Sequence, residues 1–133
     1  MTIEPSDTIM MHSSMKAIGD VEGGADTVLD ALSEYLAEGL LVLPQHTFKT
    51  IDANNPNFYV TETQPHIGIL PELFFNRKEV KRSLHPTHSV GAIGADAEEF
   101  VAGHEHCETP APKGSPYWKL LERKAKILLV GVD

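Results

Sequence analysis

Three segments near the N-terminus decide the fold class: Thr8–His12 (TIMMH), Ala25–Leu36 (ADTVLDALSEYL) and Leu40–Leu43 (LLVL). The first and last are short apolar runs, which are typical of buried strands. The middle segment has apolar residues at the spacing of an amphipathic helix, and Gly39 follows it where a C-cap glycine is expected. A strand–helix–strand order indicates parallel pairing of the two strands. The opening therefore predicts an α/β fold with a mostly parallel sheet flanked by helices.

The remaining elements are predicted from apolar spacing and from the positions of glycine and proline. Residues 45–66 show no convincing period, and such a long irregular stretch is either functional or a sign of a missed element. Further helices are expected at Ile67–Phe75, at Ala95–Ala102, and from a Ser115 N-cap, with Pro116 in the first turn, to about Lys124. Further strands are expected at Ser89–Ile93 and at Lys126–Val132 (KILLVGV), the latter as a buried central strand.

The chain has 133 residues, with 11 Lys and Arg against 19 Asp and Glu, which gives a formal net charge of −8. This length supports one domain at most, so residues 1–133 are expected to form a single domain. No apolar run approaches the roughly 20 residues that span a bilayer, and no secretory signal is visible. A single cysteine, Cys107, forms no internal disulfide, and a reducing cytoplasm is the expected compartment. The acidic balance disfavours nucleic-acid binding and suits a cationic partner.

Two polar stretches are candidates for anion binding. His12–Lys16 (HSSMK) follows the first predicted strand, where backbone N–H groups and serine hydroxyls can hold an anion. The simpler interpretation is a tight turn in which the serines satisfy backbone groups. Arg77–Arg82 concentrates basic residues in an acidic chain, which favours phosphate binding, with a solvated basic turn as the alternative.

Two further stretches contain histidine. Pro44–Phe48 (PQHTF) comes directly after the second predicted strand, and ligands of α/β sheets bind at strand ends. His46 and Thr47 could therefore line a site, or be hydrogen-bonded loop residues. Gly103–Glu108 (GHEHCE) holds two histidines and Cys107, but its spacing fits no standard metal site, so a polar loop is favoured.

Six motifs occur in order along the chain. They are His12–Gly19 with Val21–Val28, Leu43–Phe48, Gly68–Phe74, Arg82–Val90, Gly114–Pro116 and Ile127–Val132. The residues of these motifs and their order resemble the aminoglycoside N3-acetyltransferase family. The resemblance covers nearly the whole chain, from about Thr8 to Val132.

The resemblance implies a function and a missing part. This family transfers an acetyl group from acetyl-CoA to the 3-amino group of 2-deoxystreptamine antibiotics, an antibiotic-resistance activity that requires no metal. The general base of the family is a histidine in a segment that would lie beyond Asp133, so the resemblance leaves the catalytic residue unassigned here. The chain therefore looks like the N-terminal, CoA-binding half of an incomplete acetyltransferase core, and weak or absent turnover is expected.

The resemblance also implies two sets of binding residues. Those implied to hold acetyl-CoA are Ser13, Ser14, Met15, Lys16, Arg82, Ser83, His85, Thr87, His88, Ser89 and Val90. Those implied to lie near the aminoglycoside are His46, Thr47, Asp52 and Glu62. Asp52 and Glu62 are included because the family's common Phe-Asp-Pro reads Phe58-Tyr59-Val60 here. An acidic body would attract this polycationic acceptor through its field.

Two functions of other classes remain open. A non-catalytic binding or assembly module would self-associate, or pair with another polypeptide, through exposed sheet edges. A metal-dependent hydrolase would use His85, His88, His104 and His106 as ligands.

Overall fold

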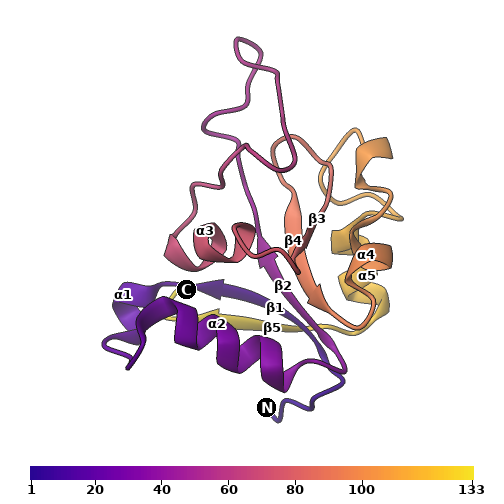
Figure 1. Ribbon diagram of the computed structural model, residues 1–133. Coiled ribbons are helices and arrows are strands. Elements are labelled where there is room, and N and C mark those ends of the chain that lie inside the picture. Colours follow the sequence, from indigo (N-terminus) through magenta and orange to yellow (C-terminus); the bar gives the residue numbers. More distant parts are fainter.

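Five strands form one mixed sheet in the computed structural model, which describes residues 1–133 (Figure 1). Their spatial order is β3-β4-β2-β1-β5. The strands are β1 (Thr8–Ser13), β2 (Leu40–Pro44), β3 (Lys81–Arg82), β4 (Val90–Gly94) and β5 (Lys126–Val130). β1 pairs in parallel with both β2 and β5, whereas β4 is antiparallel to its neighbours β2 and β3. The α/β class and the parallel β1–β2 pair are as predicted, and β4 is the one strand that runs the other way.

Helices cover both faces of the sheet (Figure 1). They are α1 (Met15–Ile18), α2 (Gly24–Tyr35), α3 (Ile69–Phe75), α4 (Ala97–Val101), the short 3₁₀ helix η1 (His104–His106) and α5 (Pro116–Glu122). Alternate residues of β1 point to opposite faces, as the pleat of a strand requires. Met10 packs in one core cluster with Phe100 of α4 and Leu120 of α5. Ile9 and Met11 pack in the other cluster, with the residues of α2 and α3.

β5 is an edge strand, so the prediction of a buried central strand at its position is wrong. β5 pairs only with β1, and Ile127 and Leu129 are 58% and 57% exposed. Leu128 and Val130 on the opposite face pack against the α2 cluster. The apolar run is therefore partly buried on one face and exposed on the other.

Two local predictions have different outcomes. Ser115 caps α5 as expected, because its Oγ accepts a hydrogen bond from Trp118 N at 3.1 Å and Pro116 is the first helical residue. Gly39 is not the C-cap glycine of α2, which ends at Tyr35 with Leu36 as its cap. Glycine is required there for another reason, since a Cβ on Gly39 would lie 2.2 Å from the carbonyl oxygen of Asp7.

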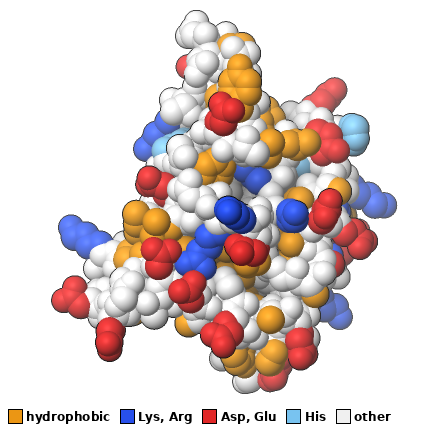
Figure 2. Space-filling model, in the orientation of Figure 1, with side chains coloured by type: hydrophobic (Ala, Val, Ile, Leu, Met, Phe, Trp, Pro, Cys, Tyr) orange, Lys and Arg blue, Asp and Glu red, His pale blue; other side chains and the backbone are white.

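The segment between β2 and α3 contains no helix or strand and projects away from the sheet (Figure 1). Acidic side chains are spread over the face seen in Figure 2, with several basic side chains near its middle. No helix in the structure has the length and apolar character needed to cross a membrane.

Candidate active site at the carboxyl edge of the sheet

The parallel strands β1, β2 and β5 end at one edge of the sheet, and a cavity of about 430 Å³ opens there. Its lining comes mainly from the ends of these three strands and from the start of α3. The lining residues are Met11, His12, Ser13, Pro44, His46, Ile67, Pro71, Leu129, Val132 and Asp133. The carboxyl edge is where open α/β sheets bind ligands. Ser13 and His46, which the sequence assigned to different ligands, share this cavity.

The Ser13–Lys16 stretch connects β1 directly to the short helix α1. Ser14 N donates to Val130 O at 2.9 Å, which extends the pairing of β1 with β5 by one residue. The Ser13 hydroxyl is buried without a hydrogen-bond partner, although Ser13 lines the cavity. Lys16 is exposed on α1 and lines a neighbouring pocket rather than this cavity. The wall of the cavity therefore contains one unpaired polar group, at Ser13.

The stretch after β2 lies against the turn between β3 and β4. Gln45 N donates to Ser89 O at 2.8 Å, and Thr47 N donates to Thr87 O at 3.0 Å. The Thr47 hydroxyl donates to Pro86 O. The structure thus brings the predicted acceptor residues next to the second predicted CoA segment, and both lie at the same edge as the cavity.

A tyrosine links these two stretches. Tyr117 of α5 lies 2.9 Å from His46 Nε2 through its hydroxyl oxygen, and the same hydroxyl donates to His88 O at 3.2 Å. The rings of His46 and His88 are 4.9 Å apart. Burial, together with the charges of neighbouring histidines, lowers the pKa of His46 to about 4. His46 is therefore a neutral imidazole at pH 7.

The turn between β3 and β4 is fixed by its own polar groups. Ser83 Oγ accepts from Val90 N at 2.9 Å, while Ser83 N donates to Val90 O at 2.9 Å. His85 Nδ1 accepts from Thr87 N at 3.3 Å and from His88 N at 3.1 Å. Burial lowers the pKa of His85, so this nitrogen stays an acceptor.

His104 of η1 is fully buried, and its side chain bonds to Ser83 of this turn. Its Nδ1 lies 2.7 Å from Ser83 Oγ, and its Nε2 lies 2.9 Å from Pro110 O. A carbonyl only accepts, so Nε2 carries the proton and Nδ1 accepts from the Ser83 hydroxyl. Burial lowers the pKa of His104 to about 4, which keeps this arrangement neutral.

Arg82 contacts protein groups with four hydrogen bonds. Its Nε donates to Ser89 Oγ at 2.9 Å, and its terminal nitrogens donate to the carbonyls of Val60, Thr63 and Gln45. Burial lowers the pKa of this guanidinium to about 10. Most N–H groups of Arg82 thus bond to the irregular segment and to Ser89, rather than facing solvent.

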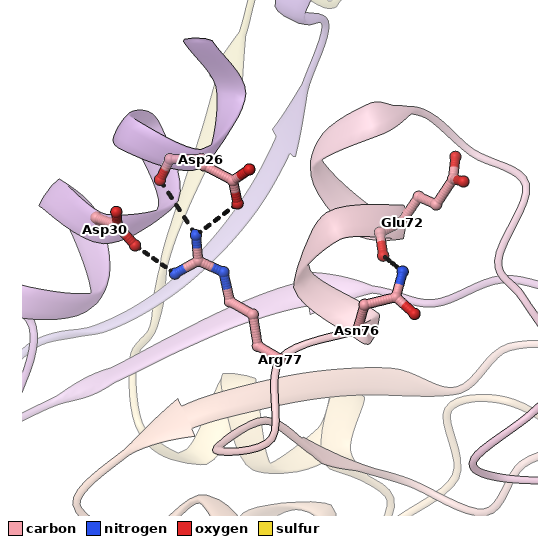
Figure 3. A network of polar contacts seen from close by, with 5 residues as sticks. All are labelled: Asp26, Asp30, Glu72, Asn76 and Arg77. Atoms are coloured by element: carbon pink, nitrogen blue, oxygen red, sulfur yellow. Dashed lines mark hydrogen bonds and ion pairs between the residues drawn. The ribbon is translucent and has the colours of Figure 1, made fainter. Parts of the chain in front are cut away.

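The rest of the basic stretch is also partly neutralised. Arg77 donates to Asp30 Oδ1 at 2.6 Å and to Asp26 Oδ1 at 2.9 Å, both on α2 (Figure 3). Nearby, Asn76 donates to Glu72 O at 2.9 Å and closes the end of α3. The carboxylates raise the pKa of Arg77 against the effect of burial. Two of the four cations predicted as a phosphate site therefore bind other groups of the chain.

Asp52 and Glu62 lie on the irregular segment and do not line the cavity. The Asp52 carboxylate accepts from Asn54 N at 2.7 Å and from Asn55 N at 2.9 Å, as in an Asx turn. Glu62 is exposed, and its backbone N donates to Tyr59 O at 3.1 Å. Neither acid is therefore in the cavity that His46 lines.

Three histidines of the hydrolase alternative lie side by side without the arrangement of metal ligands. The ring centroids of His85 and His104 are 4.7 Å apart, and those of His85 and His88 are 5.9 Å apart. No group of three or more His, Cys, Asp or Glu is arranged to hold a metal ion. Both ring nitrogens of His104 bond within the chain, and the side chain of His106 is 83% exposed. The structure gives no support to a metal-dependent site built from His85, His88, His104 and His106.

The sequence predicts the positions of two residues of the network but not their contacts. It places Tyr117 in a helix that begins at Ser115, and it offers His104 as a polar loop residue or as a metal ligand. No spacing connects either residue to the strand ends it contacts, since the link forms through the packing of α5 and η1 on the sheet. His12, the first residue of the predicted anion-binding stretch His12–Lys16, also lines the cavity.

This arrangement defines a mixed α/β protein with a cavity of polar and apolar residues at the carboxyl edge of its parallel strands. The family model for aminoglycoside 3-N-acetyltransferase matches residues 10–133. The chain therefore belongs to the aminoglycoside 3-N-acetyltransferase family.

Individual relatives agree with this assignment. The SPbeta prophage-derived aminoglycoside N(3')-acetyltransferase-like protein YokD of Bacillus subtilis is 33% identical over 95% of this chain and 54% of its own length. Aminoglycoside N(3)-acetyltransferase VII of Streptomyces paromomycinus is 32% identical over 94% of this chain and 49% of its own. The crystal structure of YokD has a TM-score of 0.81 at 28% identity, covering 96% of this chain and 59% of that one.

A second solved structure carries a ligand. AAC-IIIb, solved as a binary complex with CoASH, has a TM-score of 0.77 at 26% identity over 93% of this chain and 52% of that one. The chain spans about half the length of the curated relatives that it matches.

Proposed function

We propose that this chain binds acetyl-CoA and an aminoglycoside amine at the carboxyl-edge cavity, as part of an N3-acetyltransferase. The observation that carries the proposal is the shared cavity of Ser13 and His46, within a fold that belongs to this family. A thioester and an amine must approach each other closely for acetyl transfer, and one cavity between two polar stretches provides that proximity.

The CoA side of the proposal is supported by the polar groups of two stretches. The Ser13 hydroxyl lacks a partner, and Lys16 adds an exposed cation. His85, Thr87 and His88 lie on the turn at the same edge of the sheet. Met15 would contribute backbone. Ser14, Arg82, Ser83, Ser89 and Val90 would hold the two stretches in shape, since they already bond to other groups of the chain. AAC-IIIb, a structural neighbour, was crystallised with CoASH.

The acceptor side is supported by charge and by His46. An aminoglycoside is a polycation, and a chain with a net charge of −8 attracts one over a distance. His46 is neutral at pH 7 and stands in the cavity, next to Thr47. AAC-VIa, another neighbour at a TM-score of 0.77, was solved bound to sisomicin. In this proposal Asp52 and Glu62 contribute to the acidic field from the irregular segment. The chain would act in a reducing cytoplasm, where Cys107 and the CoA thiol stay reduced.

Calorimetry on the purified chain tests the proposal. We expect saturable binding of coenzyme A and of sisomicin, and Lys16→Ala should weaken coenzyme A binding while sisomicin binding changes little. Lys113→Ala is the matched control, because Lys113 is an exposed lysine on the loop before α5, and it should alter neither affinity. The proposal fails if neither compound binds, or if Lys16→Ala and Lys113→Ala behave alike.

A second candidate function, an assembly module, is favoured by the open edge at β5. Ile127 and Leu129 are more than half exposed on one face, and an apolar groove of about 360 Å³ lies between β5 and α2 on the other. An unpaired strand edge with apolar side chains is a site for pairing with another chain. Sedimentation would show a discrete oligomer that Leu129→Lys dissociates. Leu121→Lys, at a leucine of α5 that is also more than half exposed, is the control and should leave the oligomer intact.

A further inference from the structure

Tyr117 joins the two halves of the candidate site through one hydroxyl group. The hydroxyl lies within hydrogen-bond distance of His46 Nε2, at 2.9 Å, and of His88 O, at 3.2 Å. Burial raises the pKa of Tyr117, so the phenol keeps its proton. The side chain packs against the core cluster under α4 and α5, which fixes its position.

Counting protons assigns the tautomer of His46. The carbonyl of His88 can only accept, so it takes the single proton of the Tyr117 hydroxyl. The hydroxyl oxygen then accepts from His46 Nε2, which must carry the ring proton. The neutral imidazole has one such proton, and Nδ1 is left with a lone pair. The opposite tautomer would leave either His46 Nε2 or the carbonyl of His88 without its partner.

Nδ1 of His46 is the nitrogen available to a ligand. It makes no hydrogen bond within the chain, and it is not among the buried polar atoms that lack a partner. His46 lines the cavity together with Ser13 and His12. A bare imidazole nitrogen is an acceptor, and it suits an N–H or O–H group better than a thioester oxygen.

We propose that Tyr117 is a positioning residue that locks His46 in the Nε2–H tautomer, so that His46 Nδ1 accepts a hydrogen bond from an amine or hydroxyl of the ligand in the cavity. The identity of that ligand as an aminoglycoside rests on the proposed function. The tautomer does not, since it follows from contacts within the chain.

Nitrogen-15 NMR of the histidine rings measures the tautomer directly, without any ligand. In the wild-type chain we expect His46 to be overwhelmingly protonated at Nε2. Tyr117→Phe keeps the ring in the core and removes only the hydroxyl, and one hydrogen bond corresponds to a shift in tautomer ratio of about fivefold toward Nδ1–H. Tyr35→Phe is the matched control, because the Tyr35 hydroxyl donates to Ile3 O at 2.7 Å, away from the cavity.

The outcomes separate the two proposals. An Nδ1–H tautomer in the wild type, or an unchanged ratio in folded Tyr117→Phe, overturns the positioning role. Addition of sisomicin should move the Nδ1 resonance of the wild type, and should move it less in Tyr117→Phe. Sisomicin that binds without moving this resonance removes His46 from acceptor recognition. Sisomicin that fails to bind defeats the ligand part together with the proposed function, while the tautomer result stands by itself.

Discussion

Acid should destabilise this fold through His104, the fully buried first residue of η1, which bonds to the β3–β4 turn. Protonation at Nδ1 would remove the acceptor for the Ser83 hydroxyl and leave a charge in the core. Burial is the main cause of the low pKa of His104, about 4, and the neighbouring His85 adds to it. The unfolded chain, with the ordinary value near 6.5, binds the proton more readily.

The sign and size of the effect follow from linkage. Between pH 6.5 and 4 the unfolded state binds more protons at this site than the folded state, so stability falls as the pH falls. The difference between the two pKa values amounts to about 3 kcal/mol at pH 4. A domain of this size is stable by about 5–15 kcal/mol, so one histidine removes a sizeable part.

Urea denaturation at a series of pH values between 7 and 4 measures this loss. His104→Gln keeps a donor for Pro110 O and has no proton to gain in this range. It should cost about 1–3 kcal/mol at pH 7, because the buried Ser83 hydroxyl loses its acceptor. Its stability should then fall less steeply with acid than that of the wild type, by about 3 kcal/mol over the range.

The control is His106→Gln, in which an exposed imidazole two residues away is replaced by the same amide. This variant should follow the wild-type curve, since His106 contacts solvent and Glu105 rather than the turn. Parallel curves for the wild type and His104→Gln would refute the reasoning, because the proton would then bind equally well in both states.

Three further outcomes are expected. Arg82→Ala should release the segment at residues 45–66 and speed its cleavage in limited proteolysis, because four hydrogen bonds to that segment and to Ser89 are lost. Ser83→Ala should destabilise the chain by about 1–3 kcal/mol in urea denaturation, since Val90 N and His104 Nδ1 lose their partner. A thiol-release assay with acetyl-CoA and sisomicin should show weak or absent turnover by a polypeptide of these 133 residues, since the family resemblance places the general base beyond Asp133.

The parts of the fold that were predictable are those set by local pattern. The β1–α2–β2 unit follows from apolar spacing in residues 8–43, and the α5 start follows from Ser115 and Pro116. The direction of β4 was not predictable, because its apolar run reads the same whether the strand is parallel or antiparallel. The exposure of β5 was missed for a similar reason: Ile127 and Leu129 have the composition of a central strand, and only the order of strands places them at an edge.

The residues of the candidate site also divide into those that local sequence pattern predicts and those that only the packing of the fold brings in. Residues at strand ends, such as Ser13 and His46, were predictable because a parallel sheet collects its carboxyl ends at one edge. Tyr117 and His104 come from later in the chain and reach this edge only when α5 and η1 pack. Their roles depend on which nitrogen or oxygen faces which partner, and residue spacing carries no such information.

Arg82 shows why a basic cluster is an ambiguous signal even in an acidic chain. A guanidinium offers five N–H donors in a planar fork, which suits a phosphate and suits several carbonyls equally well. Here the guanidinium of Arg82 donates to the carbonyls of Gln45, Val60 and Thr63, so the irregular segment folds around it. The ring centroids of Phe58 and Phe75 lie 4.9 and 4.8 Å from the guanidinium carbon. A segment without helix or strand has many unpaired carbonyls, and the partly buried guanidinium of Arg82 pairs with three of them. The contacts of Arg82 therefore connect two features that are separate in the sequence, the irregular segment at residues 45–66 and the end of the basic stretch Arg77–Arg82.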